Sequence, residues 1–195
     1  MDDAGTDEGL LREFVRGKRE ALGELARRYE RALLGLASGL LDGRTDLACD
    51  AVQETWVRVI RFVAGFDGRS SFKTWVYRIA INQCRTVKGR MRDAGTVNGV
   101  GPASEHRPPE KPETGDANGA SDEKAWLREQ VRLLSPDKRT VLLLCYHEGM
   151  THQQAAEILE VPLGTVKSRI ARGIGQLQKL LADDIAAGSP DPKQP

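Results

Sequence analysis

The chain has 195 residues, a formal net charge of +1, 39% hydrophobic residues and only 5% aromatic ones. Such a composition is typical of small helical units rather than of one deep core. No apolar run approaches the ~20 residues that a membrane-spanning helix needs, and the acidic start MDDAGTDEG is unlike a signal peptide. We therefore expect a cytoplasmic protein that does not insert into membranes.

The first predicted unit covers residues 1–92 and is helical throughout. Apolar residues recur at helical spacing in Asp7–Arg16 and in Arg19–Leu41. A third helix is expected from a cap at Thr45 to about Ala64. Its inward stripe is formed by Val52, Trp56, Val59, Ile60 and Val63.

A loop and a basic helix complete this unit. Ser71, at the end of the loop Gly65–Ser71, is expected to cap a helix that reaches about Arg92. From Arg69 to Arg92 the sequence holds basic side chains and no acidic one, and Phe72, Trp75 and Tyr77 are interleaved with them. Basic side chains with aromatic neighbours suit a surface that follows a phosphate backbone and stacks unpaired bases.

The same aromatic residues fit a second interpretation. Phe72, Trp75, Ile79 and Val87 lie close to one helical stripe, which is typical of a buried face. We therefore assign the basic side chains and Asn82 to DNA in preference to the aromatic ones.

Residues Asp93–Asp122 are rich in Gly, Pro and Ala, hold more acids than bases and lack apolar periodicity. Such a segment cannot bury enough surface to offset its ordering entropy, so we expect a disordered acidic linker. The second predicted unit, residues 123–183, begins with a helix at Glu123–Leu134. Ser135 and Pro136 then start a helix that runs to about Glu148. Residues 184–195 are expected to form a disordered tail.

The run THQQAAEILEVPLGTVKSRIARG predicts a helix-turn-helix. Thr151 caps a short helix, Gln153–Leu159, and a turn at Glu160–Leu163 leads to the helix Thr165–Leu181. The outward face of the second helix carries side chains that suit bases or phosphates: Lys167, Ser168, Ala171 and Arg172. The alternative is an ordinary helical hairpin with a solvated basic face. This alternative is disfavoured because the residues of the turn and the basic face both fit a helix-turn-helix.

The predicted fold is thus all-α, with two small helical domains joined by the linker and a helix-turn-helix in the C-terminal one. Two glycines, Gly173 and Gly175, are expected to soften the C-terminal half of the last helix.

The cysteines and histidines give no sign of a metal or redox site. Cys49, Cys84 and Cys145 stand far apart at apolar helical positions, which is typical of small buried thiols. His147 and His152 lack the i, i+4 spacing of a zinc-binding helix. No phosphate-binding loop, dinucleotide-binding motif or nucleophile elbow occurs either. We therefore expect no metal, no cofactor, no small-molecule substrate and no enzymatic activity.

The run DAVQETWVRVI, Asp50–Ile60, places Asp50, Gln53, Glu54 and Arg58 away from the apolar stripe of its helix. A polar acidic face usually means no more than solvation. Spacing alone does not make this face a binding surface.

Three runs of the sequence resemble the second and fourth conserved regions of extracytoplasmic-function (ECF) sigma factors. They are DAVQETWVRVI, FKTWVYRIAINQCR and LSPDKRTVLLLCYHEGMTHQQAAEILEVPLGTVKSRIARG. They occur in the family's order and span nearly the whole chain outside the tails and linker. The resemblance implies that core RNA polymerase and promoter DNA are partners, and it makes an anti-sigma factor a candidate third partner.

The resemblance also implies roles for particular residues. The helix that docks on core polymerase would carry Asp50, Gln53, Glu54 and Arg58. The −10 element would be approached by Phe66, Arg69, Ser70, Phe72, Lys73, Arg78, Asn82 and Arg85. The −35 element would be contacted by Thr165, Lys167, Ser168, Arg169, Ala171 and Arg172.

A transcriptional regulator that binds an operator is the alternative function. Its N-terminal helices would sense a signal or dimerise, and it would not need a second basic, aromatic-bearing surface such as Arg69–Arg92. The sequence therefore favours a sigma factor, which directs polymerase to promoters and assists melting of the −10 region.

Overall fold

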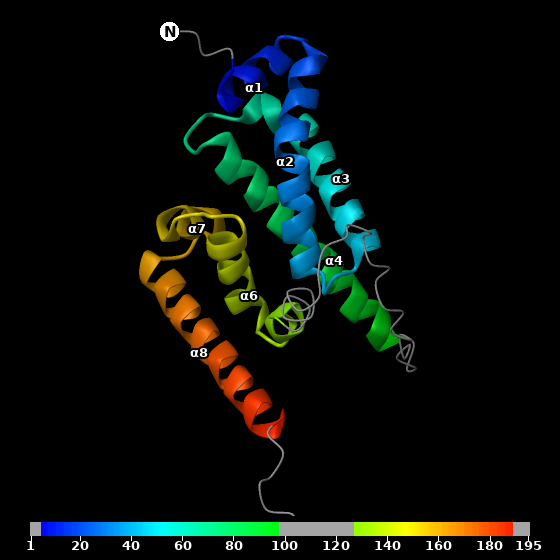
Figure 1. Cartoon of the computed structure of the whole chain (residues 1–195). Helices are drawn as coiled ribbons and strands as arrows, with labels where there is room; N and C mark the ends of the chain where they lie inside the picture. The colour runs from blue at the N-terminus through cyan, green and yellow to red at the C-terminus, as the bar shows by residue number, and fades with distance from the viewer. Residues whose placement is uncertain (1–4, 98–126, 189–195) are drawn as a thin grey trace, which may run out of the picture. The chain divides into compact units, whose positions relative to one another are not determined.

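The computed structural model describes residues 5–97 and 127–188 of the chain (Figure 1). All regular elements in these two ranges are helical, and the chain divides into two compact units, each of which is described by itself below. The all-α prediction with two helical units is confirmed. No described helix is both long and apolar enough to cross a membrane.

Four helices form the first unit: α1 (Asp7–Val15), α2 (Arg19–Leu40), α3 (Thr45–Phe62) and α4 (Phe72–Val97), with a 3-10 turn, η1 (Val63–Gly65), after α3. Helices α1, α3 and α4 all pack against α2 (Figure 1). Their amphipathic faces enclose a shared core in which Leu25, Leu33, Val59 and Val76 are completely buried.

The N-terminal caps of α3 and α4 differ from each other. Ser71 caps α4 as expected, because its Oγ accepts a hydrogen bond from the backbone N–H of Thr74 at 3.1 Å. The expected cap at Thr45 is wrong: Thr45 is already helical, and Arg44 stands at the cap position without a side-chain cap bond. Asp46 in the first turn pairs with Arg44 at 3.0 Å, and this guanidinium lowers the pKa of the Asp46 carboxyl. A carboxylate in the first turn also stabilises the positive end of the helix dipole.

The inward stripe of α3 differs from the expected one at a single position. Buried or half-buried, as expected, are Val52, Trp56, Val59 and Val63. Ile60 is 49% exposed, because it lies about 100° around the helix from Val59. Thr55 takes the inward place, and its hydroxyl donates to the Ala51 carbonyl at 2.7 Å, which satisfies the buried polar group.

The second unit consists of helical residues 127–132, α6 (Pro136–Leu142), a π-helical turn η2 (Leu143–His147), α7 (His152–Leu159) and α8 (Leu163–Gly188). Together α6 and η2 form the helix expected up to Glu148. Pro136 lies in its first turn as expected, whereas Ser135 at the cap position makes no side-chain cap bond. Gly149, with a φ of 63°, follows the end of this segment.

Two helices extend beyond their expected ends. Residues 93–97, expected in the linker, continue α4, and residues 184–188, expected in the tail, continue α8. Neither stretch contains proline, the residue that most strongly stops a helix. The rest of the expected linker, the first residues of the helix expected at 123–134 and the rest of the tail lie outside the described residues.

The three cysteines are free thiols at unequal depth. Cys84 is buried, and this burial raises its pKa to about 12. Burial also raises the pKa of Cys145, although that thiol is only half-buried, like Cys49. The expectation of a fully buried thiol is therefore correct for Cys84 alone.

Candidate nucleic-acid interface

The outer face of α4 presents cationic and amide side chains. Trp75, Arg78, Asn82 and Arg85 are spaced i, i+3, i+7 and i+10, so they share one face of the helix. Asn82 and Arg85 are exposed, and the Asn82 Oδ1 accepts a hydrogen bond from Arg85 Nη1 at 3.3 Å. This face combines positive charge with a hydrogen-bonding amide, and residues 72–92 of the helix contain no acidic residue.

The loop before α4 is held by short-range contacts. The Asp67 carboxylate accepts a hydrogen bond from the backbone N–H of Arg69 at 3.1 Å and pairs with its guanidinium at 2.8 Å. Gly68 allows the tight turn because its φ of 71° lies in the left-handed region. The Arg69 side chain is nevertheless 89% exposed. Phe66 packs on Trp75 with ring centroids 5.1 Å apart, which ties the loop to the outer face of α4.

Phe72 lies in the core and does not present its ring at the surface. It is fully buried and packs edge-on against Tyr29, with ring centroids 5.4 Å apart. The expectation that Phe72 contacts DNA is therefore wrong in this structure. Of the expected core stripe it is the only fully buried member, since Trp75, Ile79 and Val87 are half-buried. Lys73, the next residue, is half-buried with its Nζ 6.0 Å from the centre of the Tyr77 ring.

Helix α1 holds the start of α4, a role that sequence reasoning missed. Glu8 Oε1 accepts a hydrogen bond from the backbone N–H of Phe72 at 2.9 Å. A carboxylate at this position binds an otherwise unpaired N–H group and favours the positive end of the helix dipole. The sequence shows only an acidic pair, Asp7 and Glu8, in a first turn; it does not show that the partner of Glu8 is 64 residues away.

A second contact fixes α1 to α2. The Tyr29 hydroxyl donates a hydrogen bond to Asp7, and Arg28 Nη1 pairs with the same carboxylate at 3.0 Å. Burial and the bond to Asp7 raise the pKa of Tyr29, so this hydroxyl remains a donor even in alkaline solution.

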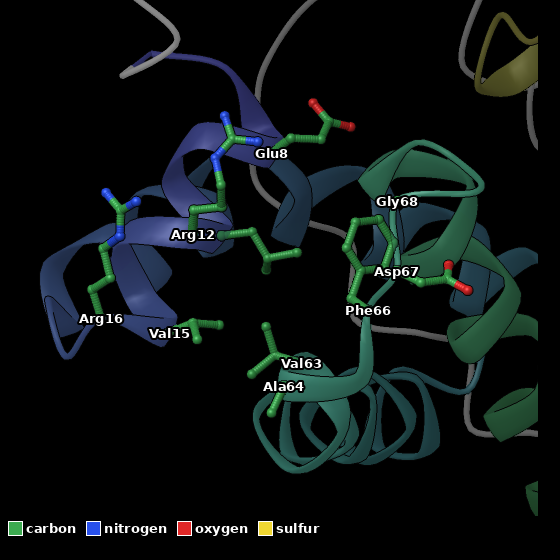
Figure 2. Close-up of a pocket in the computed structure, with 10 residues that line it drawn as sticks. Glu8, Arg12, Val15, Arg16, Val63, Ala64, Phe66, Asp67 and Gly68 are labelled. Atoms are coloured by element: carbon green, nitrogen blue, oxygen red, sulfur yellow. The ribbon is translucent and has the colours of Figure 1, made fainter.

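A groove of about 350 Å³ lies between α1 and residues 63–68. Arg12 and Arg16 line it from α1, and Phe66 and Asp67 line it from the loop (Figure 2). Helix α1 therefore lies directly beside the loop that precedes α4.

The outer face of α3 is polar but not purely so. Asp50, Gln53, Glu54 and Arg58 are all exposed, as the sequence predicted, and Glu54 pairs with Arg58 at 3.3 Å. Val57 and Ile60 lie among them with 53% and 49% of their surface exposed. Spaced i and i+3, these two side chains are neighbours on the helix surface and add apolar area to this face. Sequence reasoning missed both, since it placed Ile60 in the core and assigned no role to Val57.

The helix-turn-helix is built around the cap predicted at Thr151. The Thr151 hydroxyl accepts a hydrogen bond from the backbone N–H of Gln154 at 3.2 Å, and the Gln154 side chain accepts one from the Thr151 N–H at 2.9 Å. After α7, Glu160 has a φ of 56° and the N–H of Val161 bonds to the Ala156 carbonyl at 3.1 Å. This pair of features is a Schellman motif, and it makes the turn that the sequence predicted at Glu160–Leu163.

Helix α8 presents the expected polar face. Exposed on it are Lys167, Ser168, Ala171 and Arg172, while Val166 and Ile170 on the other side are buried. Thr165 is half-buried, and its carbonyl accepts a hydrogen bond from the Ser168 hydroxyl at 3.0 Å.

Gly173 permits a close approach between α8 and α6. A Cβ atom at this position would lie 3.0 Å from Leu142 Cδ1, whereas a Cβ at Gly175 would meet nothing within 4 Å. The helix runs through both glycines to Gly188. Gly173 thus serves packing, which the expectation of a softened helix did not include.

Comparisons with known proteins give the same assignment for both units. Residues 25–94 match the family model for Sigma-70 region 2, and residues 124–177 match the model for Sigma-70 region 4. The ECF RNA polymerase sigma-E factor of Haemophilus influenzae is 31% identical over 185 residues, which cover 88% of this chain and 93% of that protein. The RNA polymerase sigma-H factor of Pseudomonas aeruginosa is 30% identical over 194 residues, with 90% and 93% covered. The chain belongs to the ECF sigma factors.

Two solved structures have a similar fold. CnrH, in complex with the cytosolic domain of CnrY, aligns with a TM-score of 0.69 and 25% identity over 91% of this chain and 98% of CnrH. The sigma factor RpoE of Bartonella quintana, in complex with the anti-sigma factor NepR, aligns with a TM-score of 0.67 and 26% identity over 82% and 96%.

As an ECF sigma factor, the chain binds core RNA polymerase and promoter DNA and directs the polymerase to promoters. The alternative of an independent operator-binding regulator is not supported. Helix α1 lies before residue 25, so the region 2 match does not include the bond between Glu8 and the start of α4.

Proposed function

We propose that this sigma factor divides promoter recognition among three surfaces. The outer face of α3 docks on core polymerase, the loop and outer face of α4 contact the −10 element, and α8 contacts the −35 element. The observation that carries this proposal is the exposed row Lys167, Ser168, Ala171 and Arg172 on the second helix of a helix-turn-helix. Binding, orientation and release are the whole activity, and the chain performs no chemistry of its own.

The docking surface on α3 consists of Asp50, Gln53, Glu54 and Arg58 together with the exposed Val57 and Ile60. The polar groups give specificity, and the two apolar side chains supply area that becomes buried on binding. Charge at the rim of such an interface mainly steers association, while central apolar groups slow dissociation.

The −10 surface consists of Phe66, Arg69, Ser70, Lys73, Arg78, Asn82 and Arg85. Its cationic groups neutralise phosphates, and the Asn82 amide can donate and accept hydrogen bonds at the edge of an unpaired base. Extruding a base costs a few kcal/mol, which contacts to the unstacked base must offset. Phe72 supports this surface from the core, because it anchors the first turn of α4.

The −35 surface consists of Thr165, Lys167, Ser168, Ala171 and Arg172. Arginine and lysine bind guanine edges or phosphates, serine accepts or donates, and alanine contacts the thymine methyl group. Arg172 is assigned to a base, and Lys167 to either a base or a phosphate. Arg169 is left out of this surface because it pairs with Asp137.

Two further proposals follow from family membership. The sigma factor acts in the cytoplasm, where core polymerase is found. An anti-sigma factor controls it, which is supported by the similar structure of RpoE, solved in complex with the anti-sigma factor NepR.

The test is transcription of genomic DNA by core polymerase with and without the purified chain, followed by sequencing of the transcript ends. We expect new start sites that share one −35 and one −10 sequence at fixed spacing. A transcript profile identical to that of core polymerase alone would reject the proposal.

A further inference from the structure

Three contacts on one side of α8 fasten it to α6. Arg169 Nη2 pairs with Asp137 Oδ2 at 2.7 Å. Lys138 Nζ donates a hydrogen bond to Gln176 Oε1 at 2.9 Å. Between these two bonds, Gly173 brings the α8 backbone so near Leu142 that an added Cβ would lie 3.0 Å from its Cδ1.

The contacts form a stripe separate from the −35 surface. Arg169, Gly173 and Gln176 are spaced i, i+4 and i+7, so they lie on one line along the helix. The exposed row, which consists of Lys167, Ser168, Ala171 and Arg172, points to another side of the helix. Arg169 is also less accessible than that row, since only 25% of its side chain is exposed.

We propose that Arg169 is a positioning residue that orients the recognition helix through Asp137, and that it does not contact DNA. This inference rests on the proposed −35 function of α8. Arg169 is both paired with a carboxylate of its own domain and largely covered, so it is less available to a phosphate than the exposed Arg172. Asp137 is well placed as the anchor, because it lies in the first turn of α6, where a carboxylate is favoured by the helix dipole.

The geometry explains why a surface ion pair matters here. A single exposed pair contributes little to stability. Its effect on recognition is larger, because side chains that contact bases must be held within roughly 10–20° of the productive orientation. The Asp137–Arg169 pair and the Lys138–Gln176 bond flank the close contact at Gly173, so together they fix the rotation of α8 about its own axis.

The test is a double-mutant cycle in the holoenzyme. Arg169→Ala, Asp137→Ala and the double variant are compared for binding to the best −35 sequence and to a panel of single-base variants at two salt concentrations. We expect each single variant to lose discrimination by a similar factor, roughly threefold to tenfold, and the double variant to lose no more than either. The salt dependence should stay that of the wild type. The reversed pair, Asp137→Arg with Arg169→Asp, should regain part of the discrimination.

A direct DNA contact gives the opposite pattern. Arg169→Ala would then weaken binding to all sequences and lower the salt dependence, while Asp137→Ala would leave affinity unchanged or raise it. Unchanged discrimination in both single variants would also overturn the inference. The matched control is the Arg132–Glu129 pair at 3.0 Å, whose removal should not affect discrimination. Failure of the proposed function is distinguishable, because the wild-type holoenzyme itself would then show no −35 preference.

Discussion

Arg172 and Lys167 lie on the same exposed face of α8, and single substitutions separate a base contact from a phosphate contact. Arg172→Ala in the holoenzyme should cost about 1–3 kcal/mol of promoter discrimination if the guanidinium pairs with a guanine. The loss should concentrate at one or two adjacent −35 positions and be small on scrambled DNA. Binding to a panel of single-base −35 variants measures this, with Lys167→Ala in parallel. A uniform loss would make Arg172 a backbone contact, and no loss would remove this face from the interface.

The two glycines of α8 provide a matched pair of substitutions. Gly175→Ala should stabilise the protein by up to ~1 kcal/mol, because alanine is the better helix former and nothing lies within 4 Å of the new methyl group. Gly173→Ala should leave the stability of the protein unchanged or lower it, because the new methyl group must displace Leu142. Urea unfolding of both variants gives the comparison. Equal stabilisation by the two substitutions would mean that the close contact between α6 and α8 costs nothing to relieve.

Glu8 yields a test of how the loop before α4 is held. Glu8→Ala should cost ~1 kcal/mol, because it removes the side-chain acceptor for the backbone N–H of Phe72. Hydrogen exchange of the Phe72 amide should become faster. Glu13→Ala, on the same helix as Glu8, removes the pair with Lys18 and should leave that amide protected. Similar exchange in both variants would show that the Glu8 bond does not hold the loop.

The residues of α3 that stabilise the fold are different from those proposed to bind core polymerase. The inner face of this helix, with Val52, Thr55 and Val59, carries the packing, while Gln53 and Glu54 are exposed. The double variant Gln53→Ala with Glu54→Ala should therefore change stability by no more than ~0.5 kcal/mol. Binding to core polymerase should fall sharply. Thermal unfolding and a core-binding assay test the two halves, with Glu20→Ala on α2 as the surface control. Normal core binding by the double variant would exclude these residues from the docking surface.

The helices themselves could be predicted from local patterns. Apolar residues at helical spacing predicted α1 to α4 with ends close to the observed ones. Capping side chains, which bond to nearby N–H groups, predicted the starts of α4 and α7. The exposed rows on α4 and α8 followed from the same periodicity, since side chains opposite a buried stripe must face outward.

The rest depends on contacts between elements, which periodicity does not contain. The choice between Thr55 and Ile60 as the inward residue of α3 depends on how the helix is rotated against its neighbours. Phe72 fits both an aromatic DNA surface and a core, and only its packing on Tyr29 decides between them. The bonds of Glu8 and of Arg169 join residues far apart in the sequence, so no local pattern indicates them.

We expect both DNA-binding units to act only when core polymerase holds them. Each unit alone offers a small cationic face to DNA, and the net charge of the chain is only +1, so the free chain should bind DNA weakly and with little specificity. Attachment of both units to one polymerase makes the second contact intramolecular, which raises the apparent affinity strongly.

The most direct measurement is binding of a promoter fragment identified from the transcript ends to the purified chain, to core polymerase and to the two combined. We predict that only the combination binds the promoter in preference to a fragment with scrambled −35 and −10 sequences. Equally specific binding by the purified chain alone would contradict this prediction and would instead indicate a regulator that recognises its operator unaided.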